Sequence, residues 1–371
     1  MINTRLLLPG KLTGVEWFTV ETLKRLVKWN PDVRFTFLFD RNYSDEFIFG
    51  SNVNPVILSP QARHPVLWYA WFEYAVKKAI DNHQPDVFVS PDGFLSLRAN
   101  IPQIAVIHDL NFVHNPERLP RLTGGYYRHF FAKYATKATR IATVSEYSKS
   151  DIANTYHISP EKIDVVYNGV NDTFHVISPK PIIKESKGKP YFLFVGSLNP
   201  RKNILGMLRS FEQFKDNTGL PHKLVIVGDP MFKLPKTKAF YSEMTHAQDV
   251  KFAGRKDGDE LNKMYNGATA LWFVSHFEGF GIPIIEAFRA GCPVITATNT
   301  SMPEVAGDAA LLRDSGDIAG IVNDMAQIAT DDQLRTTLIK RGFERAKAFT
   351  WEASAQRLWQ CIEKTLNVKH A

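Results

Sequence analysis

The feature that most constrains this chain is an apolar strand pattern followed by a glycine turn, a short apolar helix and a second strand. Residues 268–274 predict a buried strand, and residues 293–297 predict the strand that follows the helix. Pro283 suits the first helical position, because its missing N–H would have no partner there. One carboxylate, Glu278, stands in the turn, and another, Glu286, stands in the helix.

The two carboxylates allow two interpretations. The helix that holds Glu286 is apolar nearly all round, where an unpaired carboxylate is costly, so we expect a polar group to meet it. Gly279 and Gly281 allow the backbone to come close to a ligand. Against this, the helix dipole favours a negative charge near a helix start, and Glu278 also fits a solvated loop residue. The residues alone favour a binding site and leave a structural explanation open.

Strand and helix patterns alternate along the 371 residues, which predicts parallel sheets covered by helices on both faces. Residues 65–83 place aromatic and apolar side chains at helical spacing, which indicates core packing. Residues 176–190 are proline-rich, charged and poor in apolar side chains, as a linker is. The length also favours two domains over one. We therefore predict an α/β protein with Rossmann-like domains at residues 1–175 and 176–351.

Two cations, Arg201 and Lys202, stand between a strand that ends at Gly196 and a helix. A helix N-terminus is the unfavourable end for positive charge. A bound anion would remove the conflict, because backbone N–H groups, the dipole and both side chains would face it. The alternative is that both side chains are solvated. The Asp-x-Asp sequence of Asp257 and Asp259 falls at an expected helix start, so we interpret it as a helix cap and expect no metal site.

His108 follows an apolar strand pattern at residues 104–107. The carboxyl end of a parallel strand is where binding sites are built, although a hydrogen-bonded, half-buried histidine is an equal alternative. Earlier in the chain, Gly10 and Gly14 lie in the turn before the first expected helix.

The spacing of Glu278, seven residues and Glu286, with Gly-Phe-Gly-Ile-Pro between, resembles the signature of the retaining glycosyltransferases of family 4. The resemblance covers nearly the whole chain; it is strong over residues 191–312 and loose before residue 104. It implies the GT-B fold, in which two Rossmann-like domains face each other across a cleft. It also implies that the last helix, residues 352–371, packs back on the first domain.

The resemblance implies roles for the candidate residues. Glu286 would bind the ribose of a nucleotide sugar, Arg201 and Lys202 the diphosphate, and Glu278 and His108 would face the sugar. We expect the catalytic residues to be His108, Glu278, Arg201 and Lys202. The expected nucleotide-sugar-binding residues are Gly14, Gly196, Arg201, Lys202, Gly228, Gly254, Arg255, Gly279, Phe280, Gly281, Ile282 and Glu286. Family members often have a Gly-Gly pair near Gly14, where this chain has isolated glycines.

We therefore expect a retaining, metal-independent hexosyltransferase. Its nucleotide diphosphate sugar is a co-substrate rather than a cofactor; GDP-mannose is the first candidate, by likeness to mannosyltransferases of surface polysaccharide synthesis, and UDP-sugars stay open. The acceptor would be a glycan or a lipid-linked glycan. Retention would follow from same-face attack, with double displacement through Glu278 as the alternative. A sugar-nucleotide epimerase and a non-catalytic nucleotide-sugar-binding subunit are the rival functions.

The charge of the chain suits an anionic partner. The net charge is +7 and the pI about 9.2. Residues 117–140 hold six Lys or Arg against one Glu, among aromatic side chains, which fits contact with an anionic membrane or an ordinary amphipathic helix. No nucleic-acid motif accompanies them.

The cysteine pattern and the apolar runs bear on location. Two cysteines without metal or disulfide spacing fit a reducing compartment. Residues 1–9 lack the apolar core of a secretion signal, and no apolar run reaches the roughly 18 residues that span a bilayer. We expect a cytoplasmic protein, peripheral to the inner face of the membrane.

Overall fold

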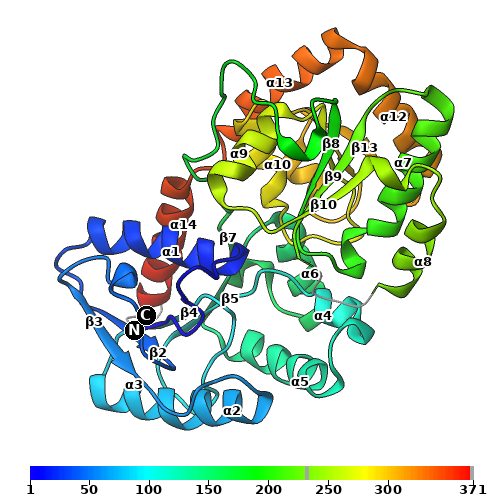
Figure 1. The fold of residues 1–371 in the computed structure, drawn as a ribbon. Coiled ribbons are helices and arrows are strands. Elements are labelled where there is room, and N and C mark those ends of the chain that lie inside the picture. The colour runs from blue at the N-terminus through cyan, green and yellow to red at the C-terminus, as the bar shows by residue number, and fades with distance from the viewer. Residues whose placement is uncertain (230–233, 368–371) are drawn as a thin grey trace. The chain divides into compact units, whose positions relative to one another are not determined.

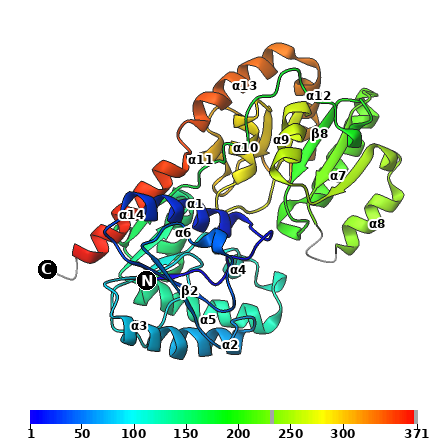
Figure 2. The ribbon, with the colours of Figure 1, turned by 60° about the vertical axis from the view of Figure 1, so that its left-hand side comes forward.

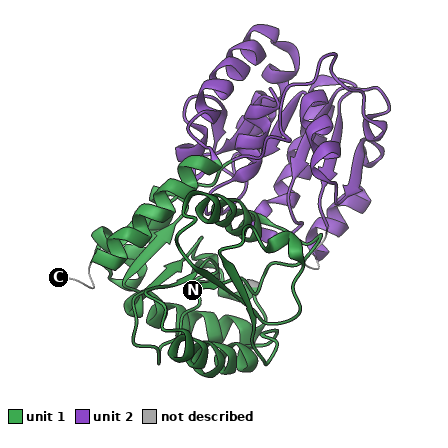
Figure 3. Ribbon diagram, turned by 90° about the vertical axis from the view of Figure 1, so that its left-hand side faces the viewer, with its two compact units in different colours: residues 1–169, 351–371 green, residues 170–350 purple. Residues whose placement is uncertain are grey.

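The computed structural model describes residues 1–229 and 234–367, which form two compact units. Unit 1 comprises residues 1–169 and the C-terminal segment from Trp351, and unit 2 comprises residues 170–350 (Figure 3). The first boundary lies before the expected position at residues 175 and 176. The residues just before position 176 belong to unit 2 because they bond to it: the backbone N–H groups of His175 and Ile177 donate to the side chains of Asn262 and Asn266 at 3.2 and 2.7 Å.

Unit 1 is built on a parallel sheet with the strand order β3-β2-β1-β4-β5-β6-β7. Its inner strands are largely buried; all five residues of β2, for example, are buried, as expected when helices cover both faces. The strands are β1 (Ile2–Asn3), β2 (Phe35–Phe39), β3 (Val53–Ile57), β4 (Phe88–Ser90), β5 (Gln103–Val106), β6 (Arg140–Thr143) and β7 (Ile163–Val165).

Helices lie on both faces of this sheet, with α1 and α14 on one face and α2, α3 and α5 on the other (Figures 1 and 2). The helices of unit 1 are α1 (Gly14–Trp29), α2 (Pro65–Ala70), α3 (Lys77–His83), α4 (Asn111–His114), α5 (Arg121–Lys137), α6 (Glu146–Tyr156) and α14 (Trp351–Asn367). The last helix, α14, contacts α1, and Arg25 of α1 pairs with Glu352 at 2.7 Å. The C-terminal helix thus belongs to the first unit.

The aromatic segment at residues 65–83 forms core, as predicted. It consists of α2, a π-helical segment (Trp71–Val76) and α3 rather than one regular helix. Trp71, Phe72 and Val76 are fully buried. The neighbouring α5 adds Tyr134, which is buried and hydrogen-bonded to Tyr126.

Unit 2 contains a second parallel sheet with the order β10-β9-β8-β11-β12-β13, which is the 3-2-1-4-5-6 order of the Rossmann fold. Its strands are β8 (Tyr191–Val195), β9 (Lys223–Val227), β10 (Val250–Gly254), β11 (Ala270–Phe273), β12 (Val294–Ala297) and β13 (Leu311–Arg313). Every strand pair in both sheets is parallel, which confirms the prediction of two α/β units with parallel sheets.

The helices of unit 2 form two packed groups. Helix α7 contacts α8 and α12, whereas α10 contacts α9, α11 and α13. The helices are α7 (Ile204–Thr218), α8 (Pro235–Glu243), α9 (Gly258–Gly267), α10 (Ile282–Arg289), α11 (Met302–Ala306), α12 (Ile318–Thr330) and α13 (Asp332–Ala346). Within the described ranges 1–229 and 234–367, none of the helices of either unit has the length and apolarity to cross a bilayer.

Candidate active site

The candidate site of unit 2 lies where the strand order of its sheet reverses. Strands β8 and β11 are neighbours there, and the segments that follow them leave the same edge of the sheet. Ligands of open parallel sheets bind at such a reversal, beyond the carboxyl ends of the strands. Gly196, Arg201 and Lys202 follow β8, and Glu278 follows β11, so the fold brings these four predicted residues to one edge.

One carboxylate holds both cations. Glu278 accepts from Lys202 Nζ through Oε1 and from Arg201 Nη1 through Oε2, each at 2.6 Å. The side chains of Lys202 and Glu278 are only 7% and 6% exposed, and that of Arg201 is 24% exposed. Glu278 is therefore not a solvated loop residue, and the cations are not simply solvated at a helix start.

The charges of this cluster fix the protonation of Glu278. Burial alone would raise the pKa of its carboxyl, but the neighbouring positive charges of Arg201 and Lys202 outweigh it and hold the pKa below the usual value. The carboxylate stays ionised, and the cluster of two cations and one anion keeps one net positive charge. Such a cluster can attract an anion and stabilise negative charge that develops beside it.

Asparagines fix the backbone that presents the cations. Arg201 and Lys202 belong to a 3₁₀ turn (Pro200–Lys202), which the side chain of Asn199 caps by accepting from the N–H of Arg201. Asn203 then takes the left-handed conformation, with φ 55°, at the start of α7. Its side-chain amide donates to the carbonyls of Val274 and Ser315 at 3.1 and 2.8 Å. The turn is thereby tied to the segment after β11.

Three predicted glycines line the same sheet edge. The N–H of Gly228 donates to the carbonyl of Gly254, and a β-carbon on residue 228 would lie 2.0 Å from the carbonyl oxygen of Gly196. Gly196 has φ 151°, and a β-carbon there would contact Lys202 Cε at 3.4 Å. Backbone therefore forms this edge because a side chain on Gly228 has no room.

The loop after β12 forms hydrogen bonds with the backbone of the turn that holds Glu278. Thr300 Oγ1 accepts from the N–H of Glu278 at 3.2 Å, and Ser301 Oγ donates to the carbonyls of Glu278 and Phe280, each at 2.9 Å. Thr300 has φ 56°, which is unusual for a β-branched residue and is often found at functional sites.

Helix α10 begins as the sequence predicts. Gly281 precedes it with φ 108°, Ile282 is its first residue, and Pro283 occupies its first turn. Ile285 and three further residues of this helix are buried. Glu286 is half-buried, and its expected polar partner is the hydroxyl of Tyr265, which donates to Oε2 at 2.8 Å. Burial raises the pKa of Glu286 to about 7, although this hydrogen bond lowers it.

His108 and Gly14 are the predicted site residues of unit 1. His108 follows β5, and its Nε2 lies 2.9 Å from the carbonyl oxygen of Pro91. Burial lowers the pKa of His108, so the neutral ring donates from Nε2 to this carbonyl and leaves Nδ1 as an acceptor. Its ring packs edge-on against Phe18 of α1 at 5.2 Å. Gly14 is the first residue of that helix.

The remaining predicted residues have varied surroundings. Arg255 is exposed just after β10. Phe280 is buried against Phe349, with ring centroids 5.5 Å apart, and Gly279 precedes it in the turn. Asp257 caps α9 by accepting from the N–H of Glu260 at 2.8 Å, which confirms the predicted cap. No group of three His, Cys, Asp or Glu in the described part of the chain is arranged to hold a metal ion.

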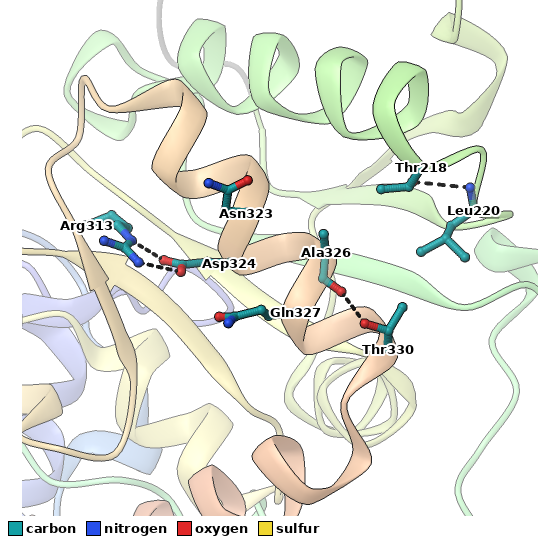
Figure 4. A pocket seen from close by; sticks show the side chains of 8 residues that line it. All are labelled: Thr218, Leu220, Arg313, Asn323, Asp324, Ala326, Gln327 and Thr330. Carbon is teal, nitrogen blue, oxygen red and sulfur yellow. Dashed lines mark hydrogen bonds and ion pairs between the residues drawn. The ribbon is translucent and has the colours of Figure 1, made fainter.

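A surface hollow of about 650 Å³ lies elsewhere on unit 2, beside α12 (Figure 4). Arg313 and Asp324 pair at its wall through two contacts of 2.7 and 2.9 Å. None of the predicted site residues lines it. The predicted site residues therefore belong to the sheet edge and not to this hollow.

The sequence reasoning missed Tyr265, Thr300 and Ser301. For Thr300 and Ser301 a signal exists, because the polar run that follows the apolar strand β12 falls at the carboxyl edge of the sheet. For Tyr265 we find no local signal, since it meets Glu286 from another helix, 21 positions away in sequence.

Two Rossmann-like units, with a cation–carboxylate cluster at the strand reversal of the second, define an α/β protein whose site suits an anionic ligand. The chain is a glycosyltransferase, because two adjoining glycosyltransferase family profiles match it. The family profile described as Glycosyltransferase Family 4 matches residues 12–174, and the profile described as Glycosyl transferases group 1 matches residues 179–345.

Curated relatives agree with this assignment, and solved structures share the fold. The chain is 25% identical to O-antigen chain mannosyltransferase B of Escherichia coli, over 96% of this chain and 95% of the relative. It is 27% identical to O-antigen chain mannosyltransferase RfbU of Salmonella typhimurium, over 67% and 66%. Its fold is similar to that of sucrose-phosphate synthase from Thermosynechococcus elongatus, with a TM-score of 0.76, 19% identity and coverage of 95% and 93%. For Anabaena HepE in complex with UDP-glucose, the TM-score is 0.71, with 18% identity and 98% coverage of both chains.

Proposed function

We propose that this glycosyltransferase is retaining and metal-independent, and that it moves a hexose from a nucleotide diphosphate sugar to a glycan or lipid-linked acceptor. The observation that supports this most is the ion cluster of Arg201, Lys202 and Glu278 at the strand reversal of unit 2. A donor diphosphate at this edge would meet two cations that Glu278 already holds in position, Lys202 buried and Arg201 partly exposed. These cations would stabilise the leaving diphosphate, the role that a metal ion has in other transferases.

The cluster suits a reaction that breaks the bond between the anomeric carbon and the diphosphate. Negative charge grows on the leaving oxygen, and Arg201 and Lys202 would stabilise it. The acceptor hydroxyl would attack from the same face and pass its proton to a phosphate oxygen of the leaving group, so the anomeric configuration is kept. Both oxygens of Glu278 are engaged in ion pairs, which favours a positioning role for this carboxylate over a nucleophilic one.

For the donor and acceptor, the relatives supply the best support. Two relatives are named as O-antigen mannosyltransferases, and one similar structure holds UDP-glucose. We propose GDP-mannose as the donor, with UDP-glucose as the next candidate, and a growing surface polysaccharide as the acceptor. Glu286 would hold the ribose, and His108 would face the transferred sugar, as the family resemblance implies.

The test combines donor binding with product analysis. A donor that binds only the native protein raises its melting temperature, so GDP-mannose, GDP, UDP-glucose and UDP are compared by thermal shift. Transfer is then followed with the stabilising donor and lipid-linked glycans, and the anomeric configuration of the product is read by NMR. We expect stabilisation by one nucleotide pair and a product with the donor's configuration.

The possible outcomes separate the rival functions. An inverted product would contradict retention. Conversion of the donor to an isomeric nucleotide sugar would indicate an epimerase, and binding without turnover would indicate a nucleotide-sugar-binding subunit. For the site itself, Glu286→Ala is expected to weaken donor binding by about 1.5–3 kcal/mol for each lost ribose hydrogen bond. Unchanged affinity would remove Glu286 from the site.

We also propose peripheral contact between unit 1 and the inner face of an anionic membrane. Exposed apolar side chains gather on α2 and the adjoining elements, and α2 contacts α5. They are Val66, Leu67, Tyr69, Tyr74 and Leu122. Cations accompany them: Arg98 lies over the ring of Tyr74 at 4.8 Å, and Lys133 lies over that of Phe130 at 5.6 Å. Exposed apolar groups beside cations suit the interface of an anionic bilayer.

Vesicle flotation tests this contact. We expect the protein to float with phosphatidylglycerol vesicles and to stay unbound with phosphatidylcholine vesicles. Val66→Ser with Leu122→Ser should reduce flotation. Ile182→Ser, which alters a residue of unit 2 that is 83% exposed, is the matched control and should leave it unchanged. Equal flotation of all three proteins would contradict the assigned surface.

A further inference from the structure

Tyr265 forms a hydrogen bond with one of the two carboxylate oxygens of Glu286. Tyr265 lies on α9 with no exposed surface, and its hydroxyl donates to Oε2 of Glu286 at 2.8 Å. Its ring packs edge-on against Phe174, with centroids 5.8 Å apart, so it has little freedom to turn away. Oε1 of Glu286 has no hydrogen-bond partner among residues 1–229 and 234–367, and Glu286 is partly exposed. One carboxylate oxygen is thus fixed, and the other is open.

The surroundings offer the carboxylate little other polar support. Helix α10 packs against α9, α11, α13, β11 and β12. Arg345 of α13 donates to backbone carbonyls of α11 at Glu304 and Val305, and Arg289 of α10 lies 3.5 Å from Asp172. Strands β11 and β12 have no ionisable side chain. Among the charged and titratable groups of these described elements, Tyr265 is the one that contacts Glu286 and perturbs it.

We propose that Tyr265 is a positioning residue for nucleotide binding, which orients Glu286 and favours its ionised form so that the open oxygen can accept the ribose hydroxyls. This inference rests on the proposed function, in which Glu286 holds the ribose. Tyr265 itself does not touch the donor; it acts through the carboxylate.

Nucleotide binding should release a proton from the carboxyl of Glu286. Because burial places the pKa of Glu286 at about 7, a fraction of the empty sites holds a protonated carboxyl at neutral pH. Ribose hydroxyls donate best to the ionised form, so binding draws the proton off. Recognition of the ribose therefore weakens as the pH falls through this pKa. Removal of the tyrosine hydroxyl raises the pKa further and moves the loss to higher pH.

The test isolates ribose recognition from the titration of the phosphates. Dissociation constants of GDP and 2′-deoxy-GDP are measured by calorimetry between about pH 5.5 and 8.5, with UDP and 2′-deoxy-UDP in parallel. Both members of a pair have the same phosphates, so their ratio reports the ribose contact alone. For the wild type we expect a ratio of about ten or more at the alkaline end that declines toward one at the acid end.

The variants make the inference specific. In Tyr265→Phe, the decline should occur roughly one pH unit higher, with a raised donor KM near neutral pH and an unchanged kcat. Glu286→Gln should give a low ratio at every pH. Tyr134→Phe, which removes a buried hydroxyl from unit 1, is the control for a general loss of stability and should keep the wild-type profile.

The outcomes separate this inference from the proposed function. A wild-type ratio that is independent of pH, or a Tyr265→Phe profile that coincides with the wild type, overturns the role of Tyr265 and leaves the ribose site in place. If Glu286→Gln distinguishes ribose from deoxyribose as well as the wild type does, the ribose assignment itself fails, and the inference fails with it.

Discussion

The ammonium of Lys202 lies 2.6 Å from Oε1 of Glu278, and both side chains are almost fully buried. The second oxygen of the same carboxylate pairs with Arg201, so one anion serves two cations. In the nucleotide-free protein, Glu278 therefore supplies the counter-charge that we expect the donor diphosphate to share. This pairing holds both cations at the sheet edge, with Lys202 buried and Arg201 partly exposed.

We predict that Glu278→Gln destabilises the free protein by about 3–5 kcal/mol, because removal of one partner leaves uncompensated buried charge. Bound GDP should restore part of the loss, since its phosphates supply negative charge to Arg201 and Lys202. Urea unfolding with and without GDP measures both effects. Glu344→Gln alters an exposed ion pair and should change stability by no more than about 0.5 kcal/mol. Equal midpoints for the two variants would contradict the structural role of Glu278.

For Lys202→Ala, we expect a larger fall in turnover than in donor affinity. The lysine would stabilise charge that develops on the leaving diphosphate, so its loss should lower kcat by about 10²–10³-fold. Steady-state kinetics at saturating donor gives kcat, and calorimetry gives affinity. A variant with normal kcat and weakened binding would show that Lys202 stabilises the bound donor and the transition state equally.

The pH dependence of stability should carry the signature of Glu286. Its pKa is raised by burial from 4.5 in the unfolded chain to about 7 in the folded protein. Between these values the folded state binds more protons than the unfolded state, so this group lowers stability as the pH rises and adds no penalty below about pH 4.5. Glu286→Gln should therefore stabilise the protein by up to about 3 kcal/mol at pH 8 and have little effect at acid pH. Urea unfolding of the wild type and Glu286→Gln across this pH range measures how the free energy of unfolding changes with pH. If the two proteins show the same pH dependence, the predicted contribution of Glu286 is wrong.

Asp257→Ala tests the cap against a metal role. Because Asp257 accepts from the N–H of Glu260 at the start of α9, its loss should cost about 1 kcal/mol of stability. Transfer activity below the unfolding temperature should be retained, and EDTA should leave the rate unchanged in both proteins. A rate that depends on Mg²⁺ or Mn²⁺ would overturn metal independence.

Local patterns in the sequence were sufficient to predict much of this fold. The apolar runs at β8 and β11 mark buried strands, and Pro283 marks the start of α10. Each signal depends on neighbours within a few residues. The unit boundary was harder to place, because the residues before 176 join unit 2 through contacts with α9, far along the chain.

Tertiary contacts set the parts of the site that the sequence did not reveal. The polar partner of Glu286 was expected, yet its identity as Tyr265 depends on how α9 packs against α10. Likewise, Arg201 and Glu278 are 77 positions apart, and their ion pair follows from the adjacency of β8 and β11. The sequence predicted an anion beside these cations, and that prediction still awaits a ligand-binding test. That the protein's own carboxylate pairs with them could be found only from the fold.

The near-contact of Gly196 and Gly228 has a consequence for engineering donor choice. Residue 228 cannot acquire even a methyl group without meeting the neighbouring carbonyl oxygen. Mutant libraries that seek a new sugar or nucleotide gain nothing by randomising this pair. Diversity is better placed at Arg255, an exposed residue just after β10, where the peptide scaffold need not move.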